Sequence, residues 1–293
     1  MKNTNGKFVY KNEKCMRDMH SFYDKAMTSS GITYREEYIE TSYGRTHIIF
    51  VGDEEKPPIF TLHGGNGITP INLMLFLPLL ENYCIITPDV IGMPGKSAPY
   101  RTLDTYKEDF GRWECEVLDK LGIDKINFVV SSYSAAMMLS LAKLAPERIN
   151  KAAMLVPSGI AHGELIPIIT KMSIPFMKYY HKPSKQTLNG IMEVMSDRDD
   201  ELCAEFFDIM MSTYKMEMRS PKEYRKSELK DFRSPVMLFA SNEDIFFPAD
   251  KVFPKAAKIF PNTPKLCLIR GKHMPHDKTM EKVCHKITAF FGT

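Results

Sequence analysis

The sequence lacks several features that would indicate particular functions. No apolar run reaches the roughly 18 residues that a membrane-spanning helix needs, and residues 1–15 contain no continuous apolar segment of the kind found in signal peptides. An excess of one charge is also lacking, because 39 Lys and Arg face 36 Asp and Glu and the basic residues are scattered. We therefore expect a cytoplasmic protein with no membrane span and no nucleic-acid partner.

Metal and nucleotide signatures are missing as well. There is no CxxC pair and no histidine at zinc-finger spacing, so we interpret the six scattered cysteines as reduced core thiols: Cys15, Cys84, Cys115, Cys203, Cys267 and Cys284. No glycine-rich loop with phosphate-binding spacing follows the first strands. The sequence therefore predicts no cofactor, and it does not indicate an oligomeric state.

What the sequence does contain is a rhythm of short apolar runs separated by helical patterns, in 293 residues of which 44% are hydrophobic. Most runs are continuously hydrophobic, as expected for strands covered on both faces, and they comprise residues 46–52, 58–65, 83–89, 126–132, 151–157, 235–241 and 265–271. This alternation predicts an α/β fold with a mostly parallel sheet and helices on both faces. Any site then lies at the carboxyl ends of the strands.

The rhythm breaks between residues 160 and 232, where helical patterns appear without strands. We predict a helical lid here, inserted between two parts of a core domain formed by residues 1–159 and 233–293. The methionines and aromatics of the lid either line an adaptable apolar pocket or pack the lid on itself. An N-terminal helix with the apolar stripe Met16, Met19, Tyr23 and Ala26 is expected to pack on the outside of the core.

The segment "FVVSSYSAAMML" (residues 128–139) passes directly from an apolar strand into a helical pattern. A residue at such a turn is lifted clear of the sheet above the positive end of the helix, which makes Ser132 and Ser134 nucleophile candidates. A nucleophile needs a base and an orienting acid from later loops. Asp244 follows the run at 235–241, and His273 follows the run at 265–271.

Taken in order, these segments resemble the α/β-hydrolase superfamily, in particular its lidded esterase-like branch. The resemblance covers nearly the whole chain, through "PPIFTLHGG", "PDVIGMPGKSAP", "INFVVSSYSAA", "LAPERINKAAMLVPSG", "SPVMLFASNEDIFFP" and "GKHMPH". It implies a Ser-Asp-His triad, an oxyanion hole, no cofactor, and hydrolysis of an ester, amide or related bond.

The resemblance also favours one of the two serines. Counting back from "PER" at residues 146–148 with the family's usual spacing gives Ser132 as the nucleophile, with Asp244 as the acid and His273 as the base. Both glycines of the family's G-x-S-x-G elbow are replaced here, by Val130 and Ser134. We expect crowding at Val130, because the residues two before and two after the nucleophile approach each other closely.

Other residues compete for these roles or support them. His276 is the alternative base, and Glu243 and Asp250 are the alternative acids. Backbone amides of Gly65 and Tyr133 are implied to form the oxyanion hole, with Asn66 as an alternative to Gly65.

The resemblance gives two further segments structural roles. It implies that His63 holds the oxyanion loop rather than acting as an acid or base. Asp89, Gly92 and Gly95 form a tight loop near the site, to which the resemblance assigns no chemistry.

The sequence as a whole predicts a serine hydrolase that cleaves a carboxylic ester, or a related acyl bond, of a small to medium apolar molecule through an acyl-enzyme. A thioester, an amide or a carbon–carbon bond as the target stays open. The alternative is a binding or signalling protein that keeps the fold but not the turnover, which the glycine-free elbow favours.

Overall fold

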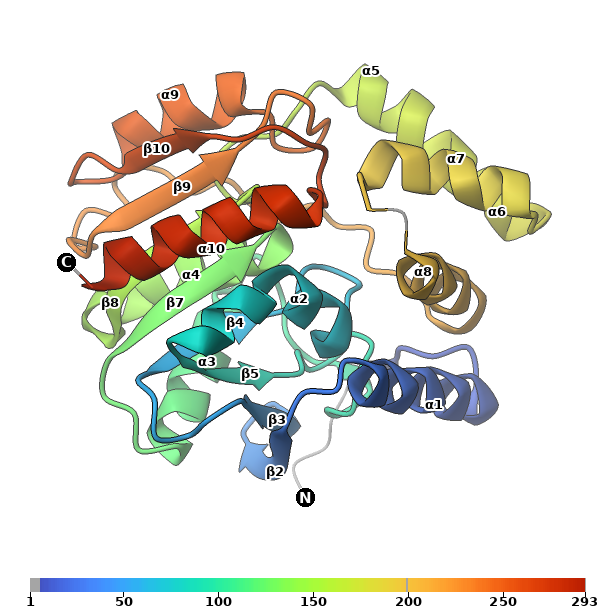
Figure 1. Cartoon of the computed structure of the whole chain (residues 1–293), viewed down its shortest axis with the longest axis horizontal. Helices are drawn as coiled ribbons and strands as arrows, with labels where there is room; N and C mark the ends of the chain where they lie inside the picture. Colours follow the sequence, from blue (N-terminus) through green and yellow to red (C-terminus); the bar gives the residue numbers. More distant parts are fainter. Residues whose placement is uncertain (1–5, 199, 293) are drawn as a thin grey trace.

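The structure is a computed structural model that describes residues 6–198 and 200–292, and its centre is a twisted sheet of eight strands (Figure 1). Their order across the sheet is β10-β9-β8-β7-β4-β5-β3-β2. The strands are β2 (Tyr34–Thr41), β3 (Gly44–Val51), β4 (Pro58–Leu62), β5 (Cys84–Pro88), β7 (Ile126–Ser131), β8 (Ile149–Leu155), β9 (Val236–Ala240) and β10 (Lys265–Leu268). All neighbours are parallel except β3, which runs antiparallel to both β5 and β2. A separate small sheet pairs β1 (Lys7–Phe8) with β6 (Tyr100–Arg101).

The predicted mostly parallel α/β fold is confirmed. Each of the seven predicted runs corresponds to one strand, from β3 to β10, and the inner strands are buried on both faces. Strand β2 was not predicted, because its sequence "YREEYIET" is charged and exposed along the edge of the sheet.

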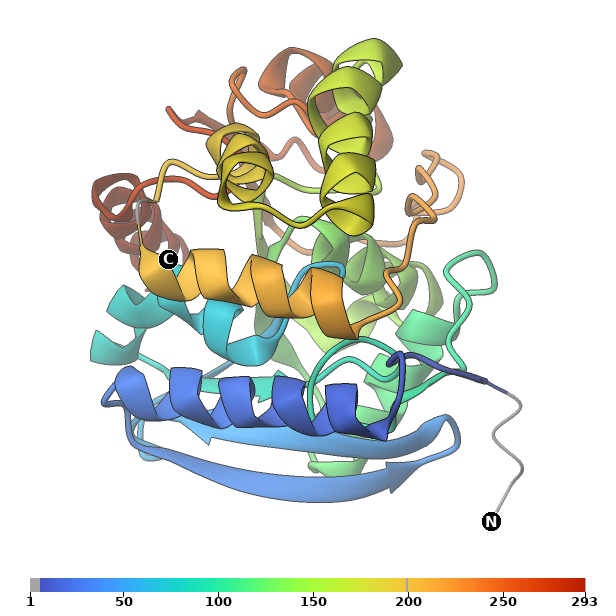
Figure 2. The same ribbon diagram turned by 90° about the vertical axis from the view of Figure 1, so that its right-hand side faces the viewer.

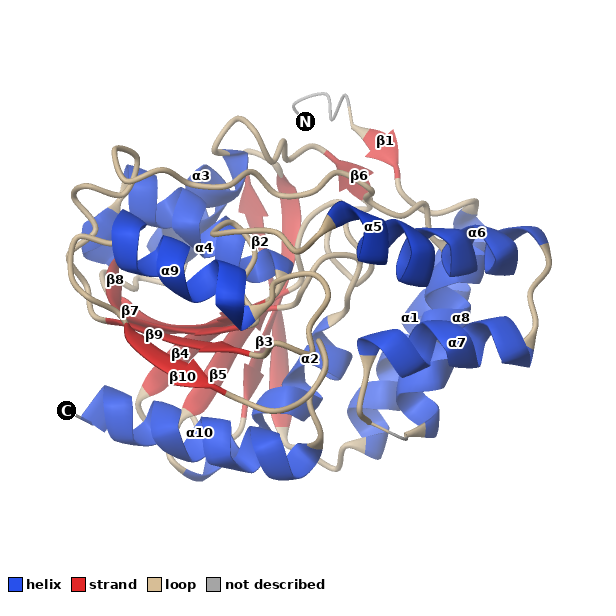
Figure 3. Ribbon diagram, turned by 90° about the horizontal axis from the view of Figure 1, so that it is seen from above, coloured by secondary structure: helices blue, strands red, loops and turns tan. Residues whose placement is uncertain are grey.

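Helices cover both faces of the sheet (Figure 3). One apolar cluster joins the sheet to α2 (Thr69–Phe76), the 3₁₀ helix η1 (Leu77–Glu81) and α10 (Asp277–Gly292). A second cluster on the opposite face joins it to α3 (Asp109–Lys120), α4 (Tyr133–Leu144) and α9 (Ala249–Ile259). The 3₁₀ turn η2 (Pro146–Arg148) leads from α4 into β8. This double cover explains why the strand sequences are continuously apolar.

In the described part of the stretch between β8 and β9, where the sequence predicts a helical insertion, the structure contains four helices and a π turn. They are α5 (Leu165–Ile168), the π turn η3 (Ile169–Ser173), α6 (Ile174–His181), α7 (Lys185–Met195) and α8 (Glu201–Thr213). They project from the core on the side away from the C-terminus (Figures 1 and 3). Residues 215–235 contain no helix, so the all-helical prediction for 160–232 is wrong for this last stretch.

The N-terminal helix α1 (Glu13–Ser29) begins at Asn12, whose side chain accepts a hydrogen bond from the Cys15 amide. It packs against the core, as predicted, and also against α8, beside which it runs in Figure 2. The rings of Phe22 and Phe206 stack with centroids 6.1 Å apart. The described chain contains no helix with the length and apolar character needed to cross a bilayer.

Candidate functional site

Ser132 lies at the sharp turn between β7 and α4. Its φ of +54° is one of the few positive values at a non-glycine residue, and its position places it at the N-terminus of α4. The turn is held by backbone bonds, because the Ser132 amide donates to the Leu155 carbonyl at 3.0 Å and the Ser132 carbonyl accepts from the amide and hydroxyl of Ser158. This neighbouring structure maintains the strained conformation.

Ser134 stands where the family elbow has glycine, and it has a different contact. Its hydroxyl accepts a hydrogen bond from the Ser131 amide at 2.9 Å and donates one to the Ser131 carbonyl at 2.7 Å. The side chain is fully buried. Val130 is also fully buried, in the apolar cluster that includes α4. A hydroxyl thus links the end of the strand to the start of the helix, which makes Ser134 a structural residue.

The structure brings Ser132, His273 and Asp244 together. The Oγ of Ser132 lies 2.8 Å from Nε2 of His273, and Nδ1 of His273 lies 3.0 Å from Oδ2 of Asp244. Asp244 is buried, and its Oδ1 accepts a hydrogen bond from the Phe246 amide at 2.8 Å. The rings of Phe246 and Phe247 pack on His273, with centroids 5.1 and 5.8 Å away. The carboxylate and the imidazole therefore each have a fixed orientation.

The alternative acids and base lie elsewhere. His276 is exposed, and its ring accepts a hydrogen bond from the Lys278 amide at the start of α10. Glu243 accepts from the Gly271 amide at 3.2 Å, and Asp250 is an exposed residue of α9. None of these three side chains contacts Ser132 in the described structure.

The segment "HGGNG" follows β4 and lies against the turn at Ser132. A Cβ on Gly65 would be 2.8 Å from a ring carbon of Tyr133, so only glycine fits there. Tyr133 is the first residue of α4, whose amide has no partner within the helix. Gly65 therefore lies against the Tyr133 side chain, and the neighbouring Gly64 lies against Ser132, where an added Cβ would be 3.9 Å from the hydroxyl oxygen.

His63 and Asn66 hold this loop from its two sides. His63 accepts a hydrogen bond from the Val90 amide at Nε2, so its Nδ1 carries the proton and donates to the Gly64 carbonyl. Burial lowers the pKa of His63, which keeps the imidazole neutral. Asn66 has a φ of +57°, and its side chain bonds both the amide and the carbonyl of Glu217.

Asp89 and its glycines form the tight loop that the sequence predicts. Asp89 is fully buried and accepts hydrogen bonds from the side chains of His47, Thr69 and Tyr23. Burial by itself raises the pKa of this carboxyl, but the hydrogen bond and charge of His47 outweigh it and leave the pKa below its usual range. The group thus stays ionised within a structural network.

A cavity of about 510 Å³ lies above the Ser132 hydroxyl, between the core and the inserted helices. Its apolar lining comes from both sides and includes Ile71, Leu75, Val156, Met172, Phe176, Phe206, Phe207 and Met210. A few polar groups also face it, among them Asn72, Ser131 and Arg219. Some of the methionines and aromatics of the insertion therefore line a cavity, which was one of the two predicted alternatives.

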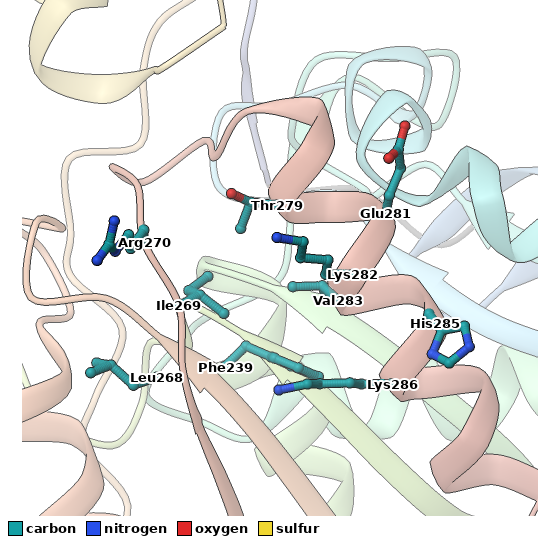
Figure 4. Close-up of a pocket in the computed structure, with 10 residues that line it drawn as sticks. All are labelled: Phe239, Leu268, Ile269, Arg270, Thr279, Glu281, Lys282, Val283, His285 and Lys286. Atoms are coloured by element: carbon teal, nitrogen blue, oxygen red, sulfur yellow. The ribbon is translucent and has the colours of Figure 1, made fainter.

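A second cavity, of about 610 Å³, lies between β10 and α10 at the edge of the sheet (Figure 4). Lys282, Lys286 and Arg270 are among its lining residues. It contains none of Ser132, Asp244 and His273. The described residues also contain no group of three or more His, Cys, Asp or Glu side chains that could hold a metal ion.

Two features of the site were not predicted from the sequence. The bond between Asn66 and Glu217 joins residues that are 151 positions apart, and the segment around residue 217 has no periodic pattern. Phe246 and Phe247, which pack on His273, follow Asp244 after one intervening residue in "NEDIFFP", so their proximity to the acid loop is visible in the sequence.

Residues 57–185 match the family model of the α/β-hydrolase fold. Carboxylesterase YbfK of Bacillus subtilis is 28% identical over 139 residues, which cover 46% of this chain and 46% of that protein. A 2-hydroxy-6-oxo-6-phenylhexa-2,4-dienoate hydrolase of Burkholderia cepacia is 27% identical over 178 residues, covering 58% of this chain and 59% of that protein. The match thus spans only about half the length of these curated relatives.

The likeness in three dimensions extends further. The crystal structure of naproxen esterase (carboxylesterase NP) from Bacillus subtilis superimposes with a TM-score of 0.78, covering 93% of this chain and 96% of that one at 20% identity. At this level of identity the comparison establishes a shared fold.

Proposed function

We propose that this chain, whose residues 57–185 match the family model of the α/β-hydrolase fold, is a serine hydrolase of that superfamily that cleaves carboxylic esters. The observation that carries the proposal is the unbroken line of hydrogen-bond distances from Ser132 through His273 to Asp244. The names of relatives such as carboxylesterase YbfK support an ester as the substrate.

The proposed reaction is acyl transfer to Ser132 followed by hydrolysis. Nε2 of His273 takes the hydroxyl proton as Oγ of Ser132 bonds to the carbonyl carbon, and the same nitrogen then returns a proton to the departing alcohol. A water molecule, deprotonated by His273 in turn, attacks the acyl carbon. The bond to Oγ of Ser132 breaks, His273 returns the proton to that oxygen, and the acid leaves. Asp244 keeps the imidazole in the required tautomer and stabilises its cation.

Negative charge develops on the carbonyl oxygen in both steps. We assign its stabilisation to the backbone amides of Gly65 and Tyr133, two residues that line the same cavity as Ser132, with the positive end of α4 adding to their effect. Removing one such donor in an enzyme of known mechanism costs about 10²–10³ in kcat. Glycine at position 65 is part of this assignment, because no side chain fits against Tyr133.

The size and lining of the cavity favour a small to medium apolar substrate. Its volume of about 510 Å³ and its lining of aliphatic, aromatic and methionine side chains suit an apolar acyl or alcohol group. We further propose that helices α5 to α8 act as a lid over this cavity, with residues 1–159 and 233–293 as the core. Met172, Phe176 and Phe207 would then be the lid's contribution to substrate binding.

A non-catalytic binding protein is the second candidate, and the glycine-free elbow is the observation that favours it. Against it stands the contact of Ser134 with Ser131, which links the strand to the helix without either glycine. The turn at Ser132 retains its positive φ despite Val130. Geometry therefore favours the enzyme.

The test is labelling of the folded protein with a fluorophosphonate, combined with turnover of a panel of short- and medium-chain esters. We expect the wild type and Ser134→Ala to be labelled, and Ser132→Ala to lose both the label and at least about a thousandfold in kcat. Thioester and amide substrates in the panel show which type of bond the protein cleaves. Turnover that survives in Ser132→Ala contradicts the mechanism, and a folded wild type that takes no label supports the binding protein.

A further inference from the structure

Exposed apolar side chains gather on one part of the inserted helices, the continuous helical segment from α5 through η3 to α6. Figure 2 shows the ribbon of this segment in yellow-green. We call this surface the α5–α6 face. Its apolar members are between 41% and 74% exposed, and they are Leu165, Ile166, Ile169, Ile174, Met177 and Tyr180. Contiguous exposed apolar surface on a folded protein marks an interaction site more often than single residues do.

The fold itself does not require these outer residues to be apolar. The inner side of the same segment already lines the cavity, through Ile168, Met172 and Phe176. A helix on the surface of a water-soluble protein normally has a polar outer side opposite such an apolar stripe. Here both sides are apolar, and packing on the cavity explains only the inner one. The apolar residues on the outer side therefore need a separate explanation.

The charged side chains within the segment itself are all positive, although the exposed Glu164, which pairs with Lys251 at 4.0 Å, directly precedes it. Residues 165–192 contain no Asp or Glu, whereas they contain Lys171, Lys178, Lys182 and Lys185. Within residues 6–198 and 200–292, none of these four lysines forms an ion pair. The α5–α6 face therefore combines apolar side chains with uncompensated cations.

The cavity opens within this face. Leu165 and Ile169 belong both to the exposed apolar set and to the lining of the cavity. Met218, which is 73% exposed, also belongs to the lining. A molecule that reaches the face can thus contact the entrance to the cavity above Ser132 without leaving an apolar environment.

We propose that the α5–α6 face docks on an anionic lipid surface and that the cavity receives an ester carried in that surface. Apolar side chains insert at the boundary between head groups and acyl chains, while neighbouring lysines pair with anionic head groups. The docking is independent of the proposed hydrolysis, whereas delivery of a lipid-borne ester rests on it.

A second copy of the chain suits the face less well. In a twofold dimer through this face, the same uncompensated lysines would meet their own copies, and like charges across an interface are unfavourable. An anionic lipid surface satisfies both the apolar and the cationic side chains. The occupant argued here is therefore a lipid surface.

The experiment is flotation of the full-length protein with vesicles of phosphatidylcholine alone or of an equal mixture with phosphatidylglycerol. Ser132→Ala protein is used so that no substrate is consumed. One variant removes apolar surface (Ile166→Ser with Met177→Ser), and another removes charge (Lys171→Gln, Lys178→Gln and Lys182→Gln). The matched controls are Leu268→Ser, an apolar residue 62% exposed on β10, and the exposed Lys226→Gln.

We expect binding to the mixed vesicles, weaker binding to phosphatidylcholine, and loss of affinity by about tenfold or more in both face variants but not in the controls. High salt should weaken wild-type binding. No vesicle binding by the folded protein, or binding that both face variants retain, overturns the proposal. A dimer that the face variants dissociate also overturns it, because the occupant is then a second copy.

A second measurement separates the docking proposal from the proposed esterase function. The same face variants are made in protein that retains Ser132, and their turnover of a water-soluble ester is measured. None of the five substituted residues lines the cavity, so kcat and KM for that ester should match those of the wild type. Hydrolysis of an ester embedded in mixed vesicles should fall with vesicle binding. Vesicle binding by a protein that hydrolyses no ester would leave the docking surface in place and contradict the proposed function alone.

Discussion

The side-chain amide of Asn66 bonds both backbone polar groups of Glu217, accepting from its N–H at 2.6 Å and donating to its carbonyl at 3.0 Å. Asn66 directly follows Gly65, whose amide we assign to the oxyanion hole. Glu217 lies in the segment that returns from α8 to the core. The oxyanion loop and the end of the helical insertion are therefore joined by one side chain.

Replacing Asn66 by glycine tests whether this bond positions the oxyanion loop. Glycine accepts the φ of +57° but removes both hydrogen bonds. We expect kcat for a soluble ester to fall about tenfold to a hundredfold, because small displacements of a catalytic group have effects of this size. The measurement is steady-state kinetics with a thermal melt, and an unchanged kcat in folded protein would show that the loop holds its own shape.

Gly65→Ala places a methyl group against the Tyr133 ring, where the new Cβ would be 2.8 Å from a ring carbon. Relief requires the loop or the Tyr133 side chain to move, and a movement of the loop displaces the assigned donor on Gly65. We expect about a hundredfold loss of kcat and a matching loss in the rate of fluorophosphonate labelling.

Gly190→Ala is the control for that substitution. Gly190 lies inside α7, and a Cβ there meets nothing within 4 Å. The change should raise stability by about 0.5–1 kcal/mol and leave kcat unchanged. If Gly65→Ala behaves like Gly190→Ala, the oxyanion hole is not where we assign it.

Ser134→Gly restores a glycine of the family elbow, yet we expect it to weaken the fold. It removes the hydroxyl that bonds the amide and carbonyl of Ser131, both at a buried site. Urea unfolding should show a loss of about 1–3 kcal/mol, while kcat stays within a few-fold of the wild type. Loss of labelling in a folded Ser134 variant would instead implicate this serine in the chemistry.

The sequence allowed the sheet and the three proposed catalytic residues to be predicted for the same reason. Strands buried on both faces must be continuously apolar, and the loops at their carboxyl ends must then carry the chemistry. The order of the loops indicated Asp244, His273 and one of two serines, and the family's spacing favoured Ser132 over Ser134. The structure brings these three together, and their catalytic roles stay predictions. Strand β2 was not predicted, because an exposed edge strand does not need an apolar sequence and "YREEYIET" has none.

Contacts that depend on backbone atoms could not be predicted in this way. The partner of Asn66 is the main chain of Glu217. Any residue type would provide the same main-chain groups, so this contact cannot be recognised from the sequence. Likewise, the bonds of Ser134 to Ser131 depend on the angle between β7 and α4, which the sequence does not give. Crowding at Val130 was expected from the family motif, whereas the structure accommodates that side chain in the buried cluster with α4.

Glu114 offers a test in the core, far from the chemistry. It is fully buried on α3, and within the described residues neither of its carboxyl oxygens has a hydrogen-bond partner. Burial raises the pKa of this carboxyl well above its ordinary value of 4.5, so the folded protein holds a proton that the unfolded chain releases. The unfolded state therefore binds fewer protons at neutral pH, and stability falls as the pH rises through that window.

We expect Glu114→Met, which fills similar space without polar atoms, to stabilise the protein at pH 7 and to remove this pH dependence. The wild type should lose about 1.4 kcal/mol of unfolding free energy per pH unit from this group between pH 4.5 and its raised pKa. Below pH 4.5 both states of the wild type carry the proton, so the advantage of the variant should shrink there. Urea unfolding of both proteins across this range measures the difference, and parallel curves would mean that Glu114 is ionised in the folded state as well.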